Sequence, residues 1–201
     1  MAVLLEEIPE SLLVEEIDGV PFYRKGYKDV LLGLKEQEEI MGSSKLQSFI
    51  IAFIVKFLNR YLPNDLDVVS SESGLHLSTG SNLATDIAIY NINEVGNIFE
   101  TVYFDTPPKV VIEVDVKVDL EKNKISETAY IKRKTKKMLN FGVEKVVWIL
   151  TATQTVIIAD ANQSDWRMTD FGGEIDLMND IRFSIKQLIE ERGFQLPALE
   201  N

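Results

Sequence analysis

Charged and aliphatic side chains alternate in the segment 107–117, Pro-Pro-Lys-Val-Val-Ile-Glu-Val-Asp-Val-Lys. Successive side chains of a β-strand point to opposite faces of its sheet, so Glu113, Asp115 and Lys117 would share one face. The other face would carry only valine and isoleucine. Desolvating an unpaired carboxylate is costly, so charges in such an apolar strand are expected to be paired or to bind a cation. The pattern therefore predicts a metal site at a strand end.

A second carboxylate, Asp86, lies in the apolar segment Thr85-Asp86-Ile87-Ala88-Ile89, which also has the composition of a strand. Two carboxylates from neighbouring strands, with a lysine nearby, can hold a divalent cation that activates water for attack on phosphorus. A purely structural interpretation is also open. In that case Asp86 caps a turn, and the charged face of 113–117 is a half-exposed sheet surface with a cross-strand salt bridge.

Lys117 is one candidate for the lysine of this site, because it would share a face with Glu113. A strand rises about 3.3 Å per residue, which places its α-carbon about 13 Å from that of Glu113. Lys117 could therefore pair more easily with Asp115.

Lys134 is the other candidate, and helical geometry favours it. At 100° per residue, four residues of the predicted helix around it fall on one stripe: Tyr130, Lys134, Met138 and Phe141. A lysine within an apolar stripe points inward and needs a partner, whereas Lys132 and Lys136 would point to solvent. We favour Lys134 for the site and keep Lys117 as the alternative.

Glu39 is an additional candidate acid. Apolar residues recur at helical spacing through 35–62, and Pro63 ends the pattern. Glu39 is in phase with this apolar face, so it would look into the site if the helix continues through Gly42. Gly42 is also where the helix could break.

The remaining pattern predicts a mixed α/β core. A hairpin is expected over 12–23, since Asp18-Gly19 suits a two-residue turn. A helix is expected over 124–141, with Gly142 as its C-cap. Strands are predicted at 66–77, 83–90, 98–104, 110–118, 143–150 and 155–159. A short pair at 166–171 and 174–177 leads to a last helix at 180–192. We expect one domain over 1–195 and a mobile tail over 196–201.

Composition narrows the function classes. The chain has 201 residues, 45% of them hydrophobic, and no cysteine, which excludes disulfides, thiolate zinc sites and cysteine nucleophiles. Acidic residues near the start and the lack of an uncharged run of roughly 18 residues predict a cytoplasmic protein without a membrane span. The net charge of −11 argues against indiscriminate wrapping of nucleic acid. A local basic patch is still compatible with it.

Several of these residues together resemble a known family. They are Asp86, Pro107-Pro108, Glu113-Val114, Lys134 eight positions before Gly142-Val143, and the aromatic-containing strand that follows. This set is similar to the restriction-endonuclease-like bacterial proteins of the PD-(D/E)XK nuclease superfamily, from the hairpin near Gly19 to at least Leu150. The chain departs from the pattern at Thr85, where proline is usual, and at Asp115, where the superfamily's usual motif has lysine. A migrated lysine, Lys134, could replace it, or Asp115-Val116-Lys117 could itself be the motif.

The resemblance implies a restriction-endonuclease-like core, with a mixed central β-sheet flanked by helices and an N-terminal β-hairpin. It also implies a Mg²⁺ site, for which Mn²⁺ could substitute, together with DNA as partner and frequent homodimers. We therefore expect a metal-dependent DNA endonuclease in which Asp86, Glu113 and Asp115 hold the metal and Lys134 or Lys117 assists water attack. RNA as substrate is left open, and no protein partner is identifiable.

Two other functions compete with the endonuclease. The first is a non-catalytic nucleic-acid-binding or assembly protein that retains the nuclease fold, which the altered motif and the net charge of −11 favour. The second, a serine hydrolase, is poorly supported, because the single histidine lies in an unremarkable strand and no nucleophile-elbow motif is present.

Overall fold

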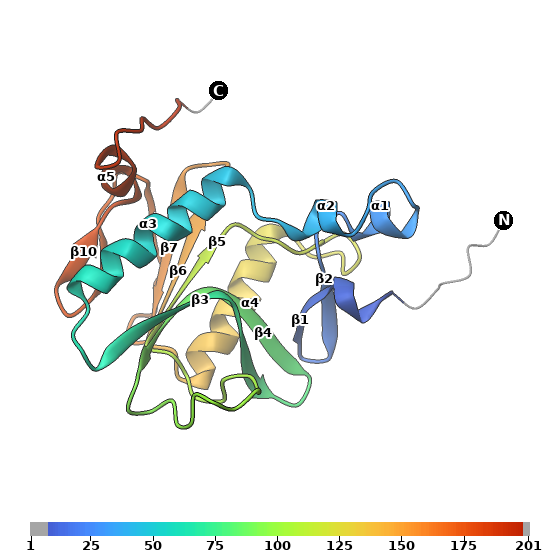
Figure 1. Ribbon diagram of the computed structural model, residues 1–201, viewed down its shortest axis with the longest axis horizontal. Helices are drawn as coiled ribbons and strands as arrows, with labels where there is room; N and C mark the ends of the chain where they lie inside the picture. Colours follow the sequence, from blue (N-terminus) through green and yellow to red (C-terminus); the bar gives the residue numbers. More distant parts are fainter. Residues whose placement is uncertain (1–7, 199–201) are drawn as a thin grey trace.

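A mixed sheet of eight strands forms the centre of the computed structural model, which describes residues 8–198 (Figure 1). The strand order is β2-β1-β4-β5-β6-β7-β8, and β3 pairs with β4. Among these described strands, only the pairing of β5 with β6 is parallel. The strands are β1 (Leu13–Ile17), β2 (Val20–Tyr23), β3 (Leu66–Ser78), β4 (Ser81–Asn91), β5 (Val110–Val114), β6 (Lys145–Leu150), β7 (Thr155–Asp160) and β8 (Arg167–Asp170). A separate hairpin consists of β9 (Ile175–Met178) and β10 (Ile181–Phe183).

Helices cover both faces of the sheet (Figure 1). On one face, α3 (Lys45–Tyr61), α5 (Ile185–Glu190) and the β9–β10 hairpin enclose one apolar core. On the other, α4 (Glu127–Phe141) and the β1–β2 hairpin enclose a second core around Trp148. The short helices α1 (Tyr27–Leu31) and α2 (Glu38–Met41) connect the hairpin to α3. The predicted mixed α/β fold with an N-terminal hairpin is confirmed.

Strand β5 lies between these layers, and all five of its residues are buried. Val110, Ile112 and Val114 belong to the α3-side core and Val111 to the α4-side core, as the alternating pattern predicts. The predicted strand 110–118 is too long, however. The strand ends at Val114 because the next residue has a φ of 61°, in the left-handed region, which turns the chain.

Three other predictions differ from the structure. The strands predicted as a pair at 166–171 and 174–177 do not pair with each other, since β8 pairs with β7 and β9 pairs with β10. The expected strand at 98–104 is wrong: this stretch is part of the loop between β4 and β5, where Phe104 forms a single isolated bridge with Leu75. The apolar residues that suggested a strand are not buried in the structure, since Ile98 and Phe99 are exposed. The last helix begins at Ile185 rather than at 180, because the preceding residues form β10.

The helix predicted over 35–62 is interrupted at Gly42. Gly42 adopts an extended conformation between α2 and α3, and Ser44 caps α3 by accepting a hydrogen bond from the Gln47 amide. At the other end of the chain, Leu196 packs against the α3-side core, so the predicted tail is anchored at its start. Residues 199–201 lie outside the described part of the chain. Within residues 8–198, every helix is too short or too polar to cross a bilayer.

Helix α4 ends at Gly142, which has a φ of +120°, so its predicted role as C-cap is confirmed. An added Cβ would lie 3.0 Å from Cγ of Pro107. We expect Gly142→Ala to lower the free energy of unfolding by about 1–3 kcal/mol, because alanine is strained in this conformation. Urea unfolding would measure the change, with Gly33→Ala, at an uncrowded glycine of positive φ, as a control for backbone strain alone. Equal destabilisation of both variants would exclude a contribution from Pro107.

Candidate active site

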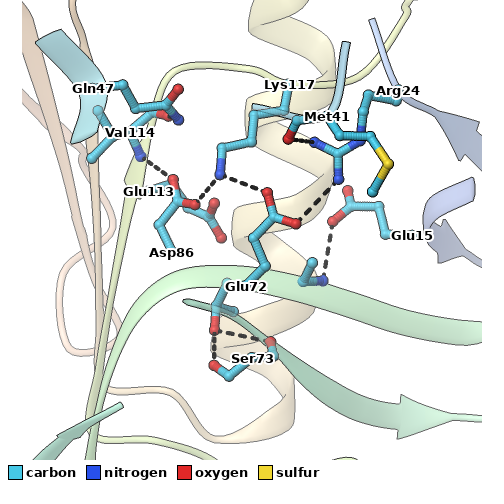
Figure 2. A network of polar contacts seen from close by, with 12 residues as sticks. Glu15, Arg24, Met41, Gln47, Glu72, Ser73, Asp86, Glu113, Val114 and Lys117 are labelled. Atoms are coloured by element: carbon cyan, nitrogen blue, oxygen red, sulfur yellow. Dashed lines mark hydrogen bonds and ion pairs between the residues drawn. The ribbon is translucent and has the colours of Figure 1, made fainter. Parts of the chain in front are cut away.

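A small pocket lies where the β1–β2 hairpin, strands β3 to β6 and helix α4 meet. It is lined by Val14, Glu15, Glu72, Ala84, Asp86, Glu113, Asp115, Lys117, Val118, Tyr130, Lys134 and Trp148. Five of the six site residues predicted from the sequence are among them. The exception is Glu39. The structure therefore brings three predicted acids and both candidate lysines together. Figure 2 shows Asp86, Glu113 and Lys117 at this pocket.

Asp86 is held at the point where β4 and β5 separate. The last paired residues of these strands are Ile87 and Ile112, so the amide of Val114 is free to donate to the side chain of Asp86, at 2.8 Å. Its other carboxylate oxygen accepts from the ammonium of Lys117. Asp86 is buried, and these two contacts fix its carboxylate at the pocket. The interpretation of Asp86 as a turn cap does not hold, because it lies within β4.

Lys134 lies between two buried acidic side chains, Glu113 of β5 and Glu15 of β1. The Lys134 ammonium lies 2.8 Å from Glu15 Oε2, 3.1 Å from Glu113 Oε1 and 2.8 Å from the Ala84 carbonyl oxygen. Lys134 is buried as the helical stripe predicts, whereas Lys132 and Lys136 are exposed. Three oxygen atoms lie within 3.1 Å of the Lys134 ammonium, so this cation faces the buried acids rather than solvent.

One ammonium cannot neutralise two buried carboxylates, so the pKa of Glu113 is raised. Burial raises the pKa of Glu113 to about 8, against the lowering effect of Lys134 and with further raising by Asp86 and Glu15. Glu15 also accepts a hydrogen bond from the hydroxyl of Tyr130. In the metal-free protein Glu113 therefore carries a proton at neutral pH.

This pKa predicts how stability depends on pH. Unfolded Glu113 titrates near its usual 4.5, so between that value and about 8 the folded protein binds one proton more than the unfolded chain. The free energy of unfolding should therefore fall as the pH rises through this range. Glu113→Gln has no such proton and should lack this fall. Urea unfolding of the metal-free proteins at about pH 6 and about pH 8.5 measures it. An identical pH dependence in both proteins would contradict the assignment.

Lys117 reaches the pocket from the turn after β5 and lies between two carboxylates. Its ammonium contacts Asp86 and lies 3.0 Å from Oε1 of Glu72, whose Oε2 lies 3.1 Å from the guanidinium of Arg24 (Figure 2). Partial burial would raise the pKa of Glu72, but the hydrogen bond from Arg24 and the charge of Lys117 lower it overall. Glu72 is therefore ionised at neutral pH.

A β-bulge aims Glu72 at this network. The register of β3 against β4 runs from Ser70 opposite Ile87 to Ser73 opposite Thr85, so Ser71 and Glu72 together oppose Asp86. Their φ angles are 85° and 54°. Bulges of this kind redirect side chains, often beside active sites.

The two remaining predicted residues have different partners. Both carboxylate oxygens of Asp115 accept hydrogen bonds from Thr151, one from its amide and one from its hydroxyl, each at 2.7 Å. Asp115 thus joins the ends of β5 and β6 at the edge of the pocket. Glu39 would have reached the site only on a continuous helix, and that condition fails at Gly42. Its exposed side chain accepts from the amide of Glu36 instead.

Sequence reasoning missed three residues of this site: Glu15, Glu72 and Arg24. A signal existed for Glu15, because it alternates in phase with Ile17 on the buried face of β1. A carboxylate on that face needs a partner, by the argument that identified Lys134. No signal marked Glu72, whose direction depends on the bulge.

The chain is similar in structure to a solved protein. The crystal structure of a putative nuclease of DUF820 from Anabaena variabilis superposes with a TM-score of 0.63, covering 88% of this chain and 89% of that one, at 16% identity. The chain has a nuclease fold. No family model matches the sequence, and no curated protein matches it. At this identity the likeness establishes the fold alone, and the chemistry depends on the site.

The donor set of the nuclease-fold pocket fits a hard divalent cation. Within the described chain, Glu113 Oε1 is buried without a hydrogen-bond partner, although the Lys134 ammonium is near. Asp86 already binds a cation, the Lys117 ammonium. Among residues 8–198, no three acidic, histidine or cysteine side chains are grouped closely enough to hold a metal by themselves. In proteins, Mg²⁺ is commonly bound through one or two carboxylates, and water and substrate phosphate complete its shell.

Proposed function

We propose that the protein is a metal-dependent endonuclease that hydrolyses phosphodiester bonds of DNA. The observation that carries the proposal is the convergence of Asp86 and Glu113, from adjacent strands of a nuclease fold, with two lysines in one pocket. Mg²⁺, or Mn²⁺ in its place, would be held by Asp86 and Glu113, and when bound it would polarise the phosphoryl group and acidify a water molecule.

The two lysines have different roles in this proposal. Lys134 has three close oxygen neighbours, so it positions Glu113 and Glu15 rather than meeting substrate. The ammonium of Lys117 has two carboxylate neighbours for its three N–H groups, and it stands beside Asp86 nearer the solvent. Lys117 is thus the lysine with a donor free to orient the attacking water and to stabilise charge on phosphorus.

Cleavage of supercoiled plasmid and of single-stranded DNA in Mg²⁺ or Mn²⁺ tests the proposal. Metal-dependent nicking that EDTA abolishes is the expected result. RNA of matched sequence, included in the same assay, would show whether the protein distinguishes DNA from RNA. A preparation that cleaves equally well in EDTA would contradict the role of the metal.

The pairing of lysines with acids in the pocket favours a second candidate, a nucleic-acid-binding or assembly protein that keeps the fold without catalysis. Lys117 and Lys134 already neutralise part of the acidic set, as they would in a purely structural network. Calorimetry separates the two candidates. Heat of Mg²⁺ or Mn²⁺ binding that disappears in Asp86→Asn supports the enzyme, and a folded protein without such heat supports the alternative.

A further inference from the structure

Arg24 and Lys117 bracket a single carboxylate at the mouth of the pocket. One oxygen of Glu72 lies 3.1 Å from the Arg24 guanidinium and the other lies 3.0 Å from the Lys117 ammonium (Figure 2). A phosphodiester also presents two charged oxygens. It could therefore contact a guanidinium with one oxygen and an ammonium with the other, as the carboxylate of Glu72 does. Glu72 therefore stands where a phosphate of compatible geometry would be bound.

The two cations are sheltered, whereas the carboxylate between them is accessible. The side chains of Arg24 and Lys117 are 12% and 17% exposed, against 38% for Glu72. Lys117 also contacts Asp86, and Arg24 contacts the carbonyl oxygen of Met41, so both cations keep an anchor when Glu72 moves away. Each cation thus has one contact besides Glu72.

The backbone conformation around Glu72 favours displacement of the Glu72 carboxylate by another anion. Ser71 and Glu72 both have positive φ, a strained conformation for residues other than glycine. Cavities of about 410 and 400 Å³ share Glu72 as a lining residue, one bordered by Lys117 and the other by Arg24. An incoming chain thus has room beside the bulge, and the carboxylate has room to leave.

We propose that Arg24 and Lys117 form a binding site for a phosphate group of the nucleic acid, and that Glu72 occupies this site until the phosphate displaces it. This inference rests on the proposed function for the identity of the ligand. Glu72 acts as a competing anion that lowers affinity for every phosphate ligand. Arg24 is a substrate-binding residue that no sequence motif indicates.

The test measures binding to two probes in EDTA, so that cleavage plays no part: inorganic phosphate by calorimetry and a fluorescein-labelled single-stranded DNA by anisotropy. We expect Glu72→Gln to bind both probes about tenfold more tightly than wild type, because a competing charge is removed. Arg24→Gln should bind both at least about tenfold more weakly. The matched control is Glu174→Gln, which removes the same charge beside Arg182 and should leave both affinities near wild type.

The outcomes separate this inference from the proposed function. If Glu72→Gln binds both probes no more tightly than Glu174→Gln, the competing-anion role is wrong, even where metal-dependent cleavage is found. If Glu72→Gln tightens phosphate binding but no metal-dependent cleavage is found, the anion site stands and the nuclease proposal fails. Urea midpoints close to wild type would show that the variants are folded, and Glu72→Ala repeats the test without a side-chain amide.

Discussion

Asp86→Asn and Glu113→Gln should each reduce Mg²⁺-dependent cleavage by about a thousandfold, because each removes one of the two charged ligands proposed for the metal. The amide that replaces the Asp86 carboxylate has nearly the same shape and keeps an oxygen to accept from the Val114 amide, so we expect the fold to survive. Initial nicking rates on supercoiled plasmid, at saturating Mg²⁺, measure the loss.

Asp115→Asn is the matched control for these two variants. It also removes a pocket carboxylate, but both oxygens of Asp115 are bound by Thr151 rather than free for a metal. We expect cleavage within a few-fold of wild type and a loss of stability of about 1 kcal/mol from a weakened hydrogen bond. A thousandfold loss of cleavage in Asp115→Asn would assign it to the metal, as the sequence first indicated.

Lys134→Met should destabilise the protein by about 3–5 kcal/mol at pH 8, because it leaves the buried carboxylate of Glu15 and the partly ionised Glu113 without their common cation. Glu15 and Glu113 both lie within 3.1 Å of its ammonium and have little access to water. Lowering the pH to about 5 should recover part of the loss, since protonated Glu113 no longer needs the cation. Urea unfolding at both pH values measures the effect.

Lys132→Met is the control for Lys134→Met. Lys132 lies on the exposed face of the same helix, and its substitution removes the same charge. A double variant, Glu15→Gln with Lys134→Met, should be more stable than Lys134→Met alone, since one of the two orphaned charges is gone. If Lys134→Met unfolds at the same urea concentration as Lys132→Met, the buried ion pair does not hold the site together.

The sequence predicted those parts of the fold and site that depend on local periodicity. The inward direction of Lys134 follows from the helical stripe, and the burial of Glu113 follows from alternation along β5. The burial of Asp86 likewise agrees with its apolar segment. In each case the side chain's direction is fixed by its own neighbours in the chain.

The parts that sequence could not predict depend on backbone irregularities and on partners far along the chain. Lys117 reaches Asp86 because the chain turns at Asp115. The strand pattern predicted instead that the strand continues, with the α-carbon of Lys117 about 13 Å from that of Glu113. Glu72 faces the pocket only through a bulge with two left-handed residues. Neither the turn at Asp115 nor the bulge at Ser71 and Glu72 could be predicted from the sequence. Glycine, the usual marker of positive φ, is absent from both.

The most direct test of the central claim compares wild type with Glu113→Gln on supercoiled plasmid across a Mg²⁺ titration, with EDTA as control. The proposed function predicts nicking by the wild type that rises with Mg²⁺, and none above background for the variant at any concentration. Nicking by Glu113→Gln at the wild-type rate would contradict the proposed function, because the carboxylate at the centre of the pocket would then have no part in the reaction.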